Sequence, residues 1–276
     1  MPAILLQLLA ATLYIALALL GWKGRPRGPA LDQTQRSASA IERWLLFFAL
    51  LLHAASLKGE IFPGDAMRFS FAIALSVMVW LALTLYWVEG FYARLEGLQL
   101  IGLPLAVVCV LLPAVMPGEH ILANAHSTGF RMHFLMAMLA YSLFTLAAFH
   151  ALLMAVLEKN LHRGQLPPLL AGLPPLLTME SLLFQLIHVA FVLLTLTIGS
   201  GIFFSESLFG KALTLNHKTV FAVISWMIFA ALLIGRHMRG WRGRFALRWT
   251  LAGFGALLLA YVGTRFVLEV ILGRVS

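Results

Sequence analysis

"FLMAMLAYSLFTLAAFHALLMAVL" occupies residues 134–157, and no Asp, Glu, Lys or Arg interrupts it. A run of about 20 mainly apolar residues is long enough to cross a hydrocarbon core roughly 30 Å thick as a helix. Comparable runs recur along the 276 residues, of which 61% are hydrophobic and only 11% charged. Inside a bilayer every backbone donor and acceptor must be paired within the protein, so each run predicts a helix.

The sequence therefore predicts an all-α, polytopic transmembrane helix bundle of about eight spanning helices, forming a single integral membrane domain over residues 1–276. Segments rich in Gly and Pro, such as "FPGD" and "MPGEH", separate the runs. The first run has no basic residue ahead of it and no cleavage pattern, so we expect a retained helix. The predicted spans are 3–21, 40–57, 69–88, 97–116, 131–157, 179–204, 217–236 and 247–271.

Basic residues determine the predicted orientation. The odd-numbered loops between these spans hold twelve Lys and Arg residues, and the even-numbered loops hold five. Because Lys and Arg accumulate in cytoplasmic loops, both termini are predicted to lie outside. The same rule explains the formal net charge of +9, so we expect no nucleic-acid partner. The basic segment "RHMRGWRGR" (236–244) is predicted to lie at the cytoplasmic face, near the headgroups of membrane lipids.

Four histidines are predicted to lie near the outer interface. His53, His133 and His217 fall near the outer ends of three different spans, and His126 lies in the loop before one of them. Ionisable side chains within membranes usually mark functional sites, so the cluster predicts a binding site. Two imidazoles can hold haem iron axially, and imidazoles also bind zinc or copper. Spacing alone does not choose among these metals.

The histidines also have structural explanations. An interfacial imidazole can reach headgroups and water, and His150 and His188, deeper in the membrane, can hydrogen-bond a neighbouring helix. The single Cys109 excludes a disulfide framework, and the sequence contains no CxxCH motif for covalent haem attachment. It also contains no Ser–His–acid pattern, phosphate-binding loop or pair of carboxylates at catalytic spacing. We therefore expect a protein that is not an enzyme and whose chemistry belongs to a bound cofactor.

Three segments resemble the cytochrome c assembly family, and in particular its small eight-helix YpjD-like or HemX-like branch. They are "HFLMAMLAYSLFTLAAFHALL" from His133, "PPLLTMESLLFQLIHVAFVLLTLTIGSGIFF" (174–204), and the run from "NHK" through "GWRGR" to "YVG" (216–263). The resemblance implies a haem-handling protein of the bacterial inner (plasma) membrane. Such a protein assists cytochrome c maturation or haem homeostasis, together with other maturation components.

The resemblance also implies the ligands. It implies a non-covalently bound haem b whose iron is held axially by His133 and His217, with His53 and His126 as supporting or alternative ligands. One segment departs from the family. Haem-exporting members carry a tryptophan-rich segment ending in "WDPKE", whereas this chain has "SESLFGKALTLNHK" at 205–218, so the platform that presents haem is missing.

The residues alone do not exclude two other classes of function. A transporter for a small solute or ion could use His188 and the glycines near 199–201 to line a pathway, although no internal repeat of the kind common in transporters is visible. An accessory scaffold subunit of a membrane complex would use the histidines only structurally.

Overall fold

A computed structural model describes residues 3–22, 33–64, 67–92, 96–117, 121–122, 125, 127–164, 173–203 and 217–272. These residues are helical apart from short connections and one isolated antiparallel bridge between Arg68 and Ile121. Seven of the described helices are long and apolar enough to cross a membrane, and an eighth, Gln99–Val115, is apolar but shorter. The predicted all-α polytopic fold is confirmed.

The helices follow one another along the chain with few interruptions. The last of them is continuous from Gly243 to Ile271, because two π-helical segments, η2 and η3, flank the short helix α10. The elements are α1 (Ala3–Trp22), α2 (Gln33–Ile61), α3 (Phe71–Glu89), η1 (Glu96–Leu98), α4 (Gln99–Val115), α5 (Thr128–His162), α6 (Leu176–Phe203), α8 (His217–Arg239), α9 (Gly243–Leu258), η2 (Leu259–Gly263), α10 (Thr264–Phe266) and η3 (Val267–Ile271).

Two helices extend well beyond their predicted spans. Helix α2 begins at Gln33, against a predicted start at 40, and α5 covers Thr128–His162, against a predicted 131–157. The prediction marked only apolar residues, whereas backbone hydrogen bonding continues into polar sequence at the membrane surface. His53 consequently lies eight residues before the end of α2, about 12 Å at 1.5 Å per residue.

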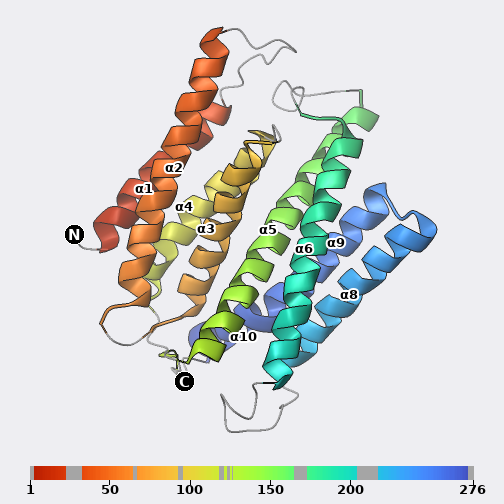
Figure 1. Ribbon diagram of the computed structural model, residues 1–276. Helices are drawn as coiled ribbons and strands as arrows, with labels where there is room; N and C mark the ends of the chain where they lie inside the picture. Colours follow the sequence, from red (N-terminus) through yellow and green to blue (C-terminus); the bar gives the residue numbers. More distant parts are fainter. Residues whose placement is uncertain are drawn as a thin grey trace.

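The long helices run up and down alternately, and both ends of the chain lie towards the same end of the bundle (Figure 1). We call this the outer end, following the predicted orientation, and the opposite end the inner end. The end of α2 and the start of α3, the end of α4 and the start of α5, and the end of α6 and the start of α8 also lie at the outer end (Figure 1).

Helix α5 is the centre of the bundle. It packs against α3 on one side and against α6 and α9 on the other, while α1 packs on α2 and α4. Small residues such as Ala140 and Ala147 are fully buried along α5 and let the neighbouring helices approach closely. Phe144 of α5 stacks on Phe229 of α8 with ring centroids 3.9 Å apart. A rigid core therefore holds the outer ends of α5, α6 and α8 in fixed positions.

Candidate functional site

His133 lies at the outer end, between α5 and α6. It is the sixth residue of α5, and its Nδ1 lies 2.9 Å from the Oγ of Ser200 on α6. The neighbouring residue Gly201 leaves room beside the ring, since a Cβ there would lie 3.5 Å from the imidazole Cε1. The side chain is half-buried. It is thus fixed by one ring nitrogen and still reachable from the outer end.

The tautomer of His133 depends on the hydrogen of Ser200. The Ser200 Oγ lies 3.0 Å from the carbonyl oxygen of Thr197. When its hydroxyl donates to that carbonyl oxygen, Ser200 accepts from the Nδ1–H of His133, and the Nε2 lone pair of the neutral imidazole is free to bind a metal. No hydrogen-bonding partner for Nε2 is present among the described residues. A metal-ligating histidine usually donates one ring N–H to a neighbouring group and binds the metal through the lone pair of the other nitrogen.

His53 has the opposite arrangement. It is fully buried, its Nδ1 lies 3.1 Å from the hydroxyl of Tyr14, and its Nε2 lies 2.8 Å from the Oγ of Ser76. Whichever tautomer is present, both ring nitrogens are already engaged. In this structure His53 joins α1, α2 and α3, and it would have to lose a hydrogen bond to bind iron.

The other two predicted ligands are placed differently. His217 is the first residue of α8 and is exposed at the outer end. His126 lies outside the described residues. The structure thus brings His133 and His217 to the same end of the bundle, but no described contact joins their rings. It does not bring His53 to that surface.

Aromatic side chains link the parts of the outer end. Phe134, next to His133, packs edge-to-face on Phe69 with ring centroids 4.7 Å apart, and Phe130 stacks on Phe134. Phe69 in turn contacts Tyr261 of η2, at 6.1 Å. Phe69 is fully buried, so these contacts pack the helices together, while Phe134 keeps part of its surface accessible.

Three charged residues surround Tyr261. The Lys218 Nζ lies 5.8 Å from the centre of the Tyr261 ring, and the Arg265 guanidinium carbon lies 6.0 Å from it. Glu269 lies one turn further along and approaches Arg265 at 3.8 Å. The other oxygen of Glu269 accepts a hydrogen bond from the backbone N–H of Phe71, at the start of α3. We call Lys218, Tyr261, Arg265 and Glu269 the outer charge cluster.

Sequence reasoning missed most of this cluster. Arg265 and Glu269 fall inside the predicted span 247–271, spaced four residues apart. Charged residues four apart within an apolar run are a recognisable signal, because they are costly in a membrane and pair along a helix.

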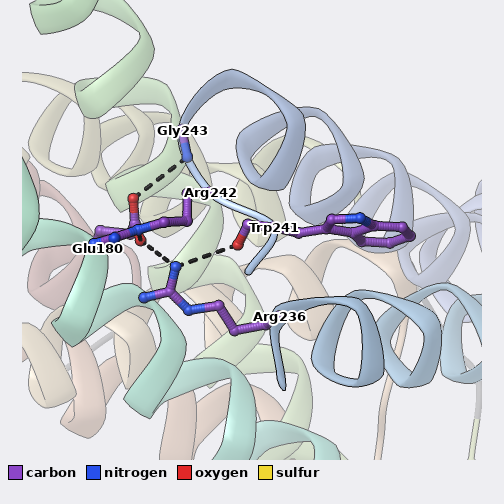
Figure 2. A network of polar contacts seen from close by, with 5 residues as sticks. All are labelled: Glu180, Arg236, Trp241, Arg242 and Gly243. Atoms are coloured by element: carbon purple, nitrogen blue, oxygen red, sulfur yellow. Dashed lines mark hydrogen bonds and ion pairs between the residues drawn. The ribbon is translucent and has the colours of Figure 1, made fainter. Parts of the chain in front are cut away.

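A second charged network lies at the inner end (Figure 2). Glu180, in the second turn of α6, forms ion pairs with both Arg236 and Arg242. It also accepts a hydrogen bond from the backbone N–H of Gly243, at 3.3 Å. Arg236 additionally donates to the carbonyl oxygen of Trp241. Two arginines of the basic segment predicted to touch lipid headgroups are thus paired within the protein. They fasten the α8–α9 turn to α6.

The two deeper histidines have other partners. The fully buried His150 lies 3.1 Å from a carboxylate oxygen of Glu89, joining α5 to the end of α3. His188 is exposed on the outside of α6, and its Nδ1 donates to the carbonyl oxygen of Phe184, at 2.6 Å. His188 therefore points away from the bundle interior, which gives no support to a solute pathway along it.

The fold and the outer site together define a multi-pass membrane protein with a metal-competent histidine at one end. The family model described as "Cytochrome C assembly protein" matches residues 10–272, and the chain therefore belongs to that family. The resemblance noted in the sequence and the predicted multi-pass membrane location are both confirmed. The family consists of cytochrome c assembly membrane proteins and is not a classical enzyme family.

Curated relatives support the same assignment. The inner membrane protein YpjD of Escherichia coli K12 is 29% identical over 230 residues, covering 81% of this chain and 84% of that protein. An uncharacterized 28.8 kDa protein of Azospirillum brasilense is 32% identical over 144 residues, covering 51% and 52%. The cytochrome c biogenesis protein CcsA of Prochlorococcus marinus MIT 9515 is 35% identical over 89 residues, covering only 32% and 28%. No solved structure gives a significant match.

Proposed function

We propose that this chain is an inner-membrane haem-binding protein that assists cytochrome c maturation or haem homeostasis. The observation that carries the proposal is the position of His133, which is half-buried at the outer end, with its Nδ1 held by Ser200 and with no hydrogen-bonding partner for Nε2 among the described residues. Family membership supports haem as the group bound, and the names of the relatives YpjD and CcsA support the inner membrane and cytochrome c biogenesis.

The residues at the outer end fit a haem. His133 would supply one axial nitrogen and His217, at the start of α8, the second, with His126 as an alternative outside the described residues. The half-buried ring of Phe134, next to His133, provides apolar surface for the macrocycle. Held between two imidazoles, haem b is a low-spin iron porphyrin with characteristic absorbance. We expect His53 to contribute through the packing of α1, α2 and α3 and not as a ligand, because both of its nitrogens are occupied.

Absorbance spectroscopy tests the proposal. The detergent-purified chain, titrated with ferric protoporphyrin IX, is expected to develop the Soret band of a low-spin, bis-imidazole haem. His133→Ala should weaken or shift this band, because it removes the iron ligand. His217→Ala should do so too if that residue is the second ligand.

The matched control is His162→Ala. His162 is exposed at the opposite end of the same helix, and its Nδ1 bonds a backbone carbonyl oxygen, so its removal should leave the spectrum unchanged. A folded protein that develops no Soret band with added haem would contradict the proposal. So would a His133→Ala spectrum that matches the wild type.

A further inference from the structure

Helix α6, on the near side of the bundle in Figure 1, carries a line of polar side chains on its exposed face. The members of this line are all exposed and follow one another at alternate spacings of three and four residues: Thr178, Ser181, Gln185, His188, Val192 and Thr195. Only Val192 among them is apolar. We call these six residues the α6 seam. Such a spacing keeps side chains in one line along a helix, and two helices pack as a left-handed pair through lines of this kind.

Two members of the seam lie deep in the membrane. Helix α6 has 28 residues, or about 42 Å at 1.5 Å per residue, whereas a hydrocarbon core is about 30 Å thick. Gln185 and His188 are the tenth and thirteenth residues of the helix, so both lie well inside that core. The exposed residues within other spans are apolar, as with Leu8 of α1, Phe48 of α2 and Met227 of α8. The seam thus differs from the lipid-facing surface of these helices.

Gln185 and His188 have unused hydrogen-bonding capacity. The Nδ1–H of His188 donates to the carbonyl oxygen of Phe184, at 2.6 Å, so Nε2 of the neutral imidazole is an acceptor. No described residue bonds that Nε2, and none bonds the side-chain amide of Gln185, which offers two donors and an acceptor. Thr195, by contrast, already accepts from the indole N–H of Trp226, at 2.9 Å. Unpaired polar groups are costly in hydrocarbon, and such side chains hydrogen-bond across to a neighbouring helix.

We propose that the α6 seam is the interface of a parallel homodimer in the membrane. A second copy of the chain fits because the two unpaired groups complement each other: Gln185 supplies donors and His188 supplies an acceptor. Both copies insert in the same orientation, and three residues of helix span about 4.5 Å, so Gln185 of each copy lies one layer from His188 of the other. A two-fold axis along the membrane normal then forms two reciprocal hydrogen bonds.

The seam also offers room for close approach. Ser181, Val192 and Thr195 are small, and Gly199, four residues after Thr195, continues the line. A Cβ on Gly199 would meet nothing within 4 Å, so this chain does not fill the space beside it. Small residues are enriched where membrane helices pair, because they let the backbones come close. Dimerisation through this seam does not depend on haem binding at the outer end.

Energy transfer in vesicles measures the association. Chains carrying a donor or an acceptor fluorophore at the C-terminus are reconstituted together into phosphatidylcholine vesicles, and transfer is followed as the protein-to-lipid ratio falls. The wild type should show transfer that is linear in the acceptor fraction, as for a dimer, and that disappears on dilution. Gln185→Leu combined with His188→Leu should weaken the association about tenfold, because two hydrogen bonds between membrane helices contribute roughly that factor.

A bulky side chain tests the seam without changing its polarity. Val192→Trp places an indole in the line of contact and should weaken the association by about tenfold or more, since close backbone approach is lost. The matched control is Val108→Trp on α4. Val108 is 58% exposed, against 57% for Val192, and lies on another helix, so this change should leave the association unaltered. Gel filtration in detergent checks that each variant is folded.

Several results would overturn the interface. A wild type that stays monomeric at every protein-to-lipid ratio would leave the seam to a different membrane protein. A dimer that survives both the Gln185→Leu, His188→Leu pair and Val192→Trp would have its interface elsewhere, and so would one that Val108→Trp weakens as much as Val192→Trp. Weakening by Val192→Trp alone would keep the interface and overturn the reciprocal hydrogen bonds.

Discussion

Each end of the bundle carries one carboxylate close to two cations, but the arrangements differ. At the inner end one carboxylate, Glu180, serves Arg236 and Arg242, and at the outer end Glu269 lies beside two cations, Lys218 and Arg265. Glu180 contacts both arginines directly and also binds a backbone N–H. Glu269 approaches only Arg265, at 3.8 Å, and uses its second oxygen on α3.

The cations at the two ends differ in their exposure to solvent. The Arg242 side chain is 55% exposed, so water can stabilise the part of its charge that Glu180 does not neutralise. The outer cations lack that exposure. One carboxylate beside two cations thus fastens two elements directly at the inner end, whereas at the outer end the carboxylate is shared between Arg265 and the backbone of α3.

The largest expected effect is at the inner end. Glu180→Gln removes the charge that holds both arginines and should lower the free energy of unfolding by about 3 kcal/mol, since breaking a buried ion pair leaves uncompensated charge, although the exposure of Arg242 limits the loss. Unfolding followed by circular dichroism in detergent measures it. Glu269→Gln is the control and should cost less. An equal or smaller loss for Glu180→Gln would show that the inner network does not fasten α6 to the α8–α9 turn.

The second effect concerns how tightly that turn packs. A Cβ on Gly235 would meet the Trp241 indole at 2.2 Å, so Gly235→Ala forces the ring to move. We expect a loss of about 1–3 kcal/mol, as for other overpacked sites. Gly255→Ala is the matched control, because nothing lies within 4 Å of its added Cβ, and a helical Gly→Ala change there should be neutral or stabilising. Equal stability of the two variants would mean that Trp241 repacks freely.

Much of this fold could be predicted from apolar runs, because a bilayer admits few structures other than helices. The alternation of the helices, and with it the placement of His133 and His217 at the same end of the bundle, followed from the same reasoning. The hydrogen-bonding state of each histidine could not be predicted in this way. It depends on Ser200 for His133 and on Tyr14 and Ser76 for His53, and isolated hydroxyl residues on distant helices carry no signal in the sequence.

The charged networks were hidden for the same reason. Glu180 and Arg242 are 62 residues apart, so neither predicts the other. The π-helical turns at η2 and η3 also have no signature in the sequence pattern, which is simply apolar. The sequence therefore located the candidate site along the chain, but which groups are engaged and which are open depends on contacts between helices.

The smallest expected effect tests the outer end directly. Glu269→Gln keeps an oxygen that can accept the Phe71 N–H but removes the negative charge beside Arg265 and Lys218. With less internal neutralisation of Arg265 and Lys218, the free energy of unfolding should fall by about 1 kcal/mol or less. Circular dichroism in detergent measures the loss. A loss as large as that of Glu180→Gln would indicate that Glu269 fastens the last helix to α3 as firmly as Glu180 fastens α6 to the α8–α9 turn.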